Sequence, residues 1–274
     1  MTNQTVEYKT KAFELRNLGY FFLIVFGLQA LKYGFLFFSG KGEAALTTSP
    51  GVILAVLGSW GPIIAAFVVT GITDGKSGIC GLWRRFWNRN ISVKWLLITL
   101  LIIPIMELIS NLVSRMLTGL AYPFFNLPNP PWMVISVFVS AFIFTGMFEE
   151  FGWRGYVLPR FQAKWNALTS SLILGVIWAS WHFGQLFFRE GSNPEPIWGF
   201  VLRIVLETII ITWIFNNTKG SVLAASLFHA MVNTGPIGIG LAKVFYGVHL
   251  LVVIIIVLIF GAKTLVRHKA EEET

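Results

Sequence analysis

The sequence predicts an all-α integral membrane protein, a bundle of about eight transmembrane helices. The 274 residues are 55% hydrophobic and only 12% charged, whereas about a quarter of the residues in soluble globular chains are charged. Apolar segments of about 20 residues, the length that crosses a bilayer as a helix, recur along the whole chain. The 11 Trp and 25 Phe residues also suit a protein that anchors itself at the membrane interface.

Eight apolar segments are long enough, or nearly so, to span as helices. In chain order they cover residues 18–38, 50–72, 93–116, 132–156, 168–188, 197–215, 221–240 and 244–262. The segment at 221–240 is the least hydrophobic. Because the linkers are short and no internal repeat is visible, we expect one membrane domain at 18–262. A polar N-terminal arm at 1–17, without a signal-peptide pattern, precedes it, and a charged tail at 263–274 follows.

The positive charges divide unevenly between the two sets of loops. With eight spans, fifteen Lys and Arg residues fall on the side that holds both chain ends. Four fall on the other side, namely Lys41, Arg115, Arg189 and Lys243. Cytoplasmic loops carry the excess of Lys and Arg, so we predict a multi-pass protein of the cell membrane with both termini in the cytoplasm.

The net charge of +8 therefore reflects topology, and no nucleic-acid partner is expected. The loop at 81–90 mixes Arg with Trp and Phe, a combination typical of a short helix that lies on an anionic leaflet. Membrane lipids are thus predicted partners. The single cysteine, Cys80, excludes an intramolecular disulfide framework.

Ionisable side chains inside apolar segments are costly and usually mark function. At the end of the fourth segment Glu149 and Glu150 stand side by side, with Arg154 four residues beyond the second. In a helix Glu150 and Arg154 share a face and can pair, while Glu149 points about 100° away. Glu150 therefore suits a structural role and Glu149 is available for chemistry. The alternative is a cytosolic loop whose charges are solvated.

Two histidines lie well inside apolar segments, His182 in the fifth and His229 in the seventh. Asn233 follows His229 at i+4, so both project from one helix face. Counted from the expected cytoplasmic helix ends, Glu149, His182 and His229 lie at similar depths, roughly 12–20 Å at about 1.5 Å per residue. The alternative for each histidine is a core residue that hydrogen-bonds to another helix.

Three further sets of charges lie inside apolar segments. Arg203 and Glu207 are four residues apart in the sixth segment and most simply neutralise each other. Glu107 in the third segment and Lys32 in the first have no sequence-near partner.

The residues form three patterns, on three apolar segments. They are EExxxR at Glu149, WxxxH from Trp178 to His182, and HxxxN from His229 to Asn233. Over about 132–240 the chain resembles the CPBP family of intramembrane endopeptidases, the CAAX-protease and bacteriocin-processing group also called Abi. Trp178 is a departure, because the eukaryotic enzymes favour Phe there.

The resemblance implies hydrolysis of a peptide bond in a membrane-associated peptide or protein, possibly lipidated, in CAAX-type processing or in bacteriocin maturation and self-immunity. It makes Glu149 the base that activates the attacking water and His182 a residue that helps to hold this water. His229 and Asn233 become the oxyanion donors, and Glu150 and Arg154 brace the site. These roles meet the needs of peptide hydrolysis, a base for water and donors aimed at the developing oxyanion.

Metal dependence and two other function classes are alternatives. Glu149, His182 and His229 could supply three ligands to a catalytic zinc and leave the fourth position for water. We favour no cofactor, because the eukaryotic members look like metal-independent glutamate proteases. A proton-coupled transporter could use a Glu/His relay, but the repeated halves typical of transporters are missing. A non-catalytic immunity or scaffold membrane protein is the third class.

Overall fold

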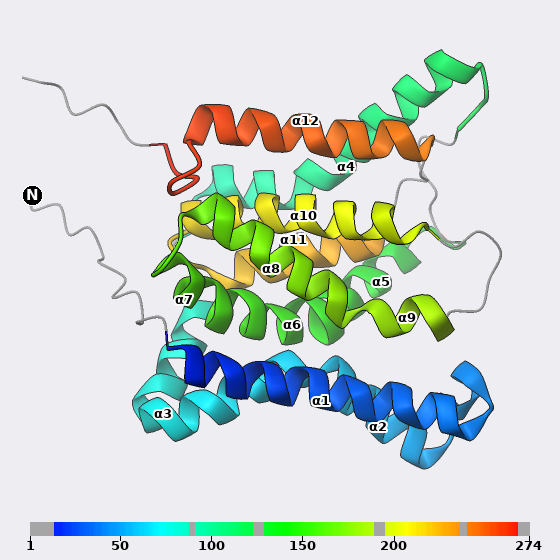
Figure 1. The fold of residues 1–274 in the computed structure, drawn as a ribbon. Helices are drawn as coiled ribbons and strands as arrows, with labels where there is room; N and C mark the ends of the chain where they lie inside the picture. Colours follow the sequence, from blue (N-terminus) through cyan, green and yellow to red (C-terminus); the bar gives the residue numbers. More distant parts are fainter. Residues whose placement is uncertain (1–13, 88–90, 123–128, 189–194, 236–239, 268–274) are drawn as a thin grey trace, which may run out of the picture.

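The computed structural model describes residues 14–87, 91–122, 129–188, 195–235 and 240–267. In these ranges all regular structure is helical, and the helices lie side by side in a bundle (Figure 1). Among the described residues, seven helices are long and apolar enough to cross a membrane: Leu15–Ser39, Gly61–Phe86, Val93–Thr118, Met133–Gln162, Ala167–Phe188, Ile197–Asn217 and Ala242–Phe260. The predicted all-α, multi-pass membrane bundle is therefore confirmed.

One side of the bundle is built from the N-terminal helices. α1 (Leu15–Ser39) packs along α3 (Gly61–Phe86), and the short α2 (Ser49–Ser59) lies against α1 after the 3₁₀ turn η1 (Gly42–Thr47). The opposite side in Figure 1 is formed by α4 (Val93–Thr118) and α12 (Ala242–Phe260).

The middle of the bundle holds the segments that carry the candidate site. They are the long helix at Met133–Gln162, α8 (Ala167–Trp181) with its extension α9 (Phe183–Phe188), α10 (Ile197–Asn217) and α11 (Val222–Thr234). α10 packs against α8, α11 and α12. Of the most apolar 18-residue stretch in each span, 67% is buried in α10 and 33% or less in the other spans. α10 is thus the interior helix.

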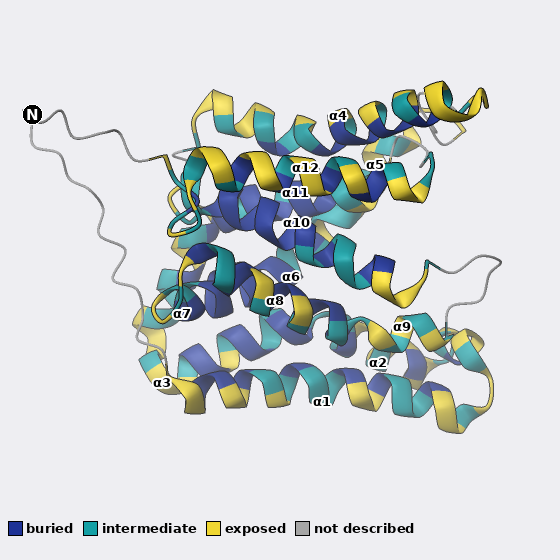
Figure 2. Cartoon of the chain, turned by 45° about the horizontal axis from the view of Figure 1, so that its top comes forward, coloured by how far each residue is buried: buried dark blue, intermediate teal, exposed yellow. Residues whose placement is uncertain are grey.

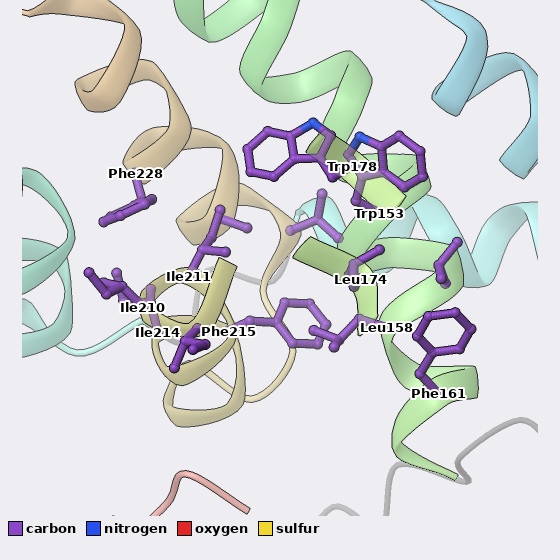
Figure 3. Packing of buried hydrophobic residues seen from close by; sticks show 14 of the residues in the cluster. Trp153, Leu158, Phe161, Leu174, Trp178, Ile210, Ile211, Ile214, Phe215 and Phe228 are labelled. Atoms are coloured by element: carbon purple, nitrogen blue, oxygen red, sulfur yellow. The ribbon is translucent and has the colours of Figure 1, made fainter. Parts of the chain in front are cut away.

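The packed core lies between α10 and the helices that face it. Ile210, Ile211, Ile214 and Phe215 of α10 are at most 5% exposed. In Figure 3 the Phe215 ring lies beside Leu158, and Ile210 lies on the other side of α10, near Phe228. The outer helices instead carry many exposed Leu, Ile and Phe side chains, seen as yellow positions on α1, α4 and α12 in Figure 2. Such an apolar exterior suits contact with lipid.

Two predicted spans differ from the observed helices. Among its described residues, the segment predicted at 221–240 forms the 13-residue α11, which begins at Val222, after its cap Ser221, and ends at Thr234, before Gly235 at φ 47°. At about 1.5 Å per residue it covers roughly 20 Å, less than a bilayer core. The segment predicted at 50–72 is divided into α2 and α3, because the chain turns at Trp60 and Pro62 starts a new helix.

The start of α1 and the end of α12 lie at the same end of the bundle in Figure 1. The helices that begin or end there include α3, α4, α7 (Leu158–Gln162) and α8. This end of the bundle corresponds to the side that the charge pattern predicts to face the cytoplasm. The cytoplasmic location of both termini stays a prediction from the charge pattern.

Candidate active site

The diacid lies inside one continuous helix of 30 residues, Met133–Gln162. This helix changes type along its length, from α5 (Met133–Ala141) to the π-helical η2 (Phe142–Met147), α6 (Phe148–Glu150), the π-helical η3 (Phe151–Val157) and α7. π-helical turns are rare and occur frequently at functional sites. Here two of them flank Glu149 and Glu150.

Glycines let this helix approach its neighbours closely on both sides of the diacid. A Cβ at Gly146 would lie 2.5 Å from the carbonyl oxygen of Ser226 in α11. A Cβ at Gly152 would lie 2.5 Å from the Cβ of Pro62 and 2.7 Å from its carbonyl oxygen. Small residues permit such close helix contacts in membrane proteins. The backbone that carries Glu149 is therefore held from two sides.

Glu150 forms a buried ionic cluster with two partners. Its Oε1 lies 2.8 Å from Nη1 of Arg154, and both side chains are fully buried. The same oxygen lies 2.8 Å from Nδ1 of His229 in α11. The predicted pairing of Glu150 with Arg154 is thus found, and the structure adds His229 to it. Glu150 ties the diacid helix to α11.

Glu149 points to α8 instead. Its Oε2 accepts a 2.9 Å hydrogen bond from the indole Nε1 of Trp178, and only 5% of the residue is exposed. The guanidinium carbon of Arg154 lies 4.7 Å from the centre of the same indole ring, a cation–π distance. In Figure 3 Trp178 stands beside Trp153 at one end of the core. Glu149 therefore has a donor and a nearby positive charge.

His182 caps the C-terminus of α8 and borders the same indole. Its Nδ1 lies 2.9 Å from the carbonyl oxygen of Trp178, so Nδ1–H donates and Nε2 is left to bind another group. The rings of Trp181 and Phe200 lie 4.6 and 6.0 Å from the imidazole, centre to centre. From α1, Nε2 of Gln29 donates to the carbonyl oxygen of Trp181 at 3.2 Å.

Asn233 lies one helical turn beyond His229 and is exposed. Its Nδ2 donates a 2.9 Å hydrogen bond to Oγ1 of Thr145 in η2. The Thr145 hydroxyl donates in turn to the carbonyl oxygen of Ala141 at 2.6 Å. Thr145 also borders an open groove of about 430 Å³ on α5 and η2, lined further by Ser136, Val137, Ser140, Ala141 and Phe144.

Five of the six predicted site residues thus fall into one network, whereas the sixth, Asn233, bonds to Thr145 instead. Trp178 joins Glu149 to His182, and Glu150 joins Arg154 to His229. The centres of the Trp178 and His229 rings lie 5.1 Å apart, which links the two groups. Sequence reasoning missed the contacts of Thr145 and Gln29. The only sequence feature that could have pointed to these two residues is that each is a polar side chain inside an apolar segment.

Arg203 and Lys32, two charged side chains inside other spans, each contact neighbouring side chains. Arg203 lies 3.4 Å from Glu207, as the spacing predicted, and 3.0 Å from Glu195. The hydroxyl of Tyr246 donates to Glu195 at 2.7 Å. Lys32 is 8% exposed, and its ammonium lies 4.8 Å from the ring centre of Tyr33.

The residues that could ligate zinc do not form a ligand set in this arrangement. In the described ranges no three His, Cys, Asp or Glu side chains are close enough together to hold a metal ion. Nδ1 of His229 is directed at Glu150, and Nδ1 of His182 at a backbone carbonyl. As placed, these side chains do not fit a metal ion.

Comparison with known proteins places the site residues in a matched segment. Residues 130–235 match the family model "Type II CAAX prenyl endopeptidase Rce1-like". The chain is 27% identical over 219 residues to CAAX prenyl protease 2 of Methanococcus maripaludis, covering 72% of this chain and 77% of that protein. It is 25% identical over 175 residues to lysostaphin resistance protein A of Staphylococcus haemolyticus, covering 63% of this chain and 46% of that protein.

Proposed function

We infer that this chain is an intramembrane endopeptidase of the CAAX type, which hydrolyses a peptide bond of a membrane-associated protein. The observation that supports the inference most is the buried Glu149, held by the Trp178 indole beside His182 and His229. The transporter alternative is not favoured, because the matching family model and the Methanococcus relative are both named as proteases.

In the mechanism we propose, Glu149 acts as the base. Its carboxylate takes a proton from a water molecule as the water oxygen attacks the carbonyl carbon of the scissile bond. The Trp178 N–H occupies Oε2 of Glu149, which leaves Oε1 for this proton transfer. Because Nδ1–H of His182 donates to the Trp178 carbonyl, Nε2 of His182 can accept the second proton of the water in a hydrogen bond.

The tetrahedral intermediate carries a negative charge on the former carbonyl oxygen, and this oxyanion needs hydrogen-bond donors directed at it. Asn233 has a second Nδ2 proton besides the one directed at Thr145, and we assign it to the oxyanion. His229 in its protonated form can donate from Nε2 while Nδ1 stays with Glu150. When the intermediate collapses, the C–N bond breaks and Glu149 returns the proton to the leaving amine.

The substrate we propose is a protein with a prenylated C-terminal segment, as the name of the Methanococcus relative suggests. The groove of about 430 Å³ beside Thr145 supports this assignment. Val137, Ala141 and Phe144 give it apolar walls, and Thr145 connects it to Asn233. A prenyl chain of the substrate that lies along this open groove would reach Thr145, which precedes Glu149 by four residues.

The test is cleavage of a defined peptide by the purified protein in lipid nanodiscs. The peptide ends in a farnesylated cysteine followed by three residues, and mass spectrometry identifies the product. We expect release of the intact tripeptide, and slower cleavage of the same peptide without the farnesyl group. Equal cleavage of both peptides would overturn the prenylated substrate class but leave the protease function standing.

Metal dependence is a second arm of this experiment. Because we propose hydrolysis by Glu149 without a metal, EDTA and phenanthroline should leave the rate of tripeptide release unchanged. If either chelator abolishes the rate and zinc restores it, Glu149, His182 and His229 would instead be assigned as ligands of a catalytic metal ion.

A further inference from the structure

The second half of α3 is an amphipathic segment with two different faces. Gly75 has φ 62° and ψ −155°, which interrupts the helix, and residues 76–86 continue after this kink. Leu82 and Phe86 are about 5% exposed, whereas Trp83 is 42% exposed and Trp87, just beyond the helix, 57%. In Figure 2 the end of α3 accordingly carries yellow and teal positions.

The buried face of this segment is attached to the helix that carries the diacid. Pro159 has no N–H to donate to the carbonyl four residues before it, that of Gly155. Nη1 of Arg85 donates to this carbonyl oxygen at 2.6 Å. The ring of the buried Phe86 lies 5.3 Å from that of Phe151, the residue after Glu150. Trp83, at the border between the two faces, contacts the Phe151 ring at 5.2 Å and is still 42% exposed. The segment therefore packs directly on η3.

The outward face combines positive charge with indole rings. At 100° per residue, Lys76, Cys80, Trp83 and Trp87 fall within about 60° of one another around the helix, with Arg84 next to them. Lys76 and Arg84 are exposed and Cys80 is partly exposed. Asp74, the single acidic residue between 70 and 90, precedes the kink.

We propose that this face, defined by Lys76, Trp83, Arg84 and Trp87, binds the headgroups of anionic phospholipids next to the catalytic helix. Lys and Arg attract anionic headgroups, and Trp prefers the membrane interface. The face lies at the end of the bundle where α1 begins and α12 ends, which is the predicted cytoplasmic side (Figure 1). Charge complementarity thus favours a lipid surface over a basic or apolar partner.

Cys80 provides a built-in probe for this proposal, because it is the only cysteine of the chain. The protein is labelled there with bimane and reconstituted in phosphatidylcholine vesicles. The vesicles contain equal small amounts of either brominated phosphatidylglycerol or brominated phosphatidylcholine as quencher. At about 1 kcal/mol per basic residue, we expect brominated phosphatidylglycerol to quench with an apparent affinity on the order of tenfold higher. Added salt should reduce this preference.

Matched variants locate the effect. Lys76→Gln combined with Arg84→Gln should abolish most of the preference, whereas Lys41→Gln combined with Lys243→Gln, exposed charges outside this face, should keep it. Phosphatidylglycerol retained on the unlabelled protein after purification from mixed vesicles gives an independent measurement with the same expectation. Equal quenching by the two lipids, or a preference that survives the first double variant, overturns the proposal. The proposal is also overturned if neither lipid quenches the label and the unlabelled protein cross-links through Cys80. That result would assign the face to contact with a second copy of the chain.

Discussion

The indole Nε1 of Trp178 donates a hydrogen bond of 2.9 Å to Oε2 of Glu149. The backbone carbonyl of the same residue accepts from Nδ1 of His182. Buried polar groups are normally hydrogen-bonded, because an unpaired one loses its hydration without compensation. Trp178 thus positions both the proposed base and the proposed water-binding histidine.

The first prediction removes the indole N–H. Trp178→Phe keeps an aromatic ring but removes the donor to Glu149. We expect kcat to fall roughly 10- to 100-fold with little change in KM, since a hydrogen bond to a charged group contributes about 1.5–3 kcal/mol. Trp181→Phe is the control, because its Nε1 has no hydrogen-bond partner among the described residues. Equal turnover by both variants would contradict a positioning role for Trp178.

The second prediction concerns the buried cluster of Glu150. Arg154→Ala or Glu150→Ala leaves a buried charge without its main partner, which costs on the order of 3–5 kcal/mol. Each single variant should unfold at a lower temperature in detergent. The double variant should lose clearly less stability than the two singles added together, because it strands no charge within the pair. Additive losses in thermal unfolding would mean that Glu150 and Arg154 do not depend on each other.

The third prediction tests the oxyanion side. Asn233→Ala should lower kcat by about 10²–10³-fold, the usual effect of losing one oxyanion donor. Thr145→Val removes only the hydroxyl that orients Asn233, so its loss should be smaller, about 10-fold. Thr145→Ser retains the hydroxyl and should restore turnover. A Thr145→Val enzyme with wild-type kcat, or no rescue by serine, would remove Thr145 from the mechanism.

The fourth prediction tests how the diacid helix is seated. Gly152→Ala places a methyl group 2.5 Å from Pro62 Cβ. Overpacking of this kind costs typically about 1–3 kcal/mol, so the unfolding temperature should fall. Gly247→Ala in α12 is the matched control, with no atom within 4 Å of the added carbon. A Gly152→Ala protein as stable as the control would show that α3 and η3 separate readily.

The fold could be predicted from sequence where one apolar run makes one helix. Apolar length identified α4, α10 and α12 within a few residues. The division at Trp60 and the short α11 could not be predicted by length alone. Hydropathy reports only how apolar a segment is. The division between α2 and α3 depends on Pro62 near the start of α3, and the short α11 lies among neighbouring helices, so it need not span the bilayer.

The site was predictable where partners are close in sequence. The i, i+4 spacing predicted the pair of Glu150 and Arg154, which is found at 2.8 Å. It could not predict that His229 reaches Glu150 or that Trp178 donates to Glu149, because those contacts depend on how α8 and α11 pack against the diacid helix. The π-helical turns on either side of the diacid likewise have no signal in residue spacing.

The central claim is that Glu149 is the base, and turnover by Glu149→Gln tests it most directly. The substitution keeps size and hydrogen-bonding capacity but removes the basic oxygen. The protein should remain folded, as checked by thermal unfolding, while tripeptide release falls by about 10²–10⁴-fold. Glu43→Gln, at an exposed glutamate outside the site, should cleave at the wild-type rate. A folded Glu149→Gln protein with wild-type turnover would contradict the mechanism proposed here.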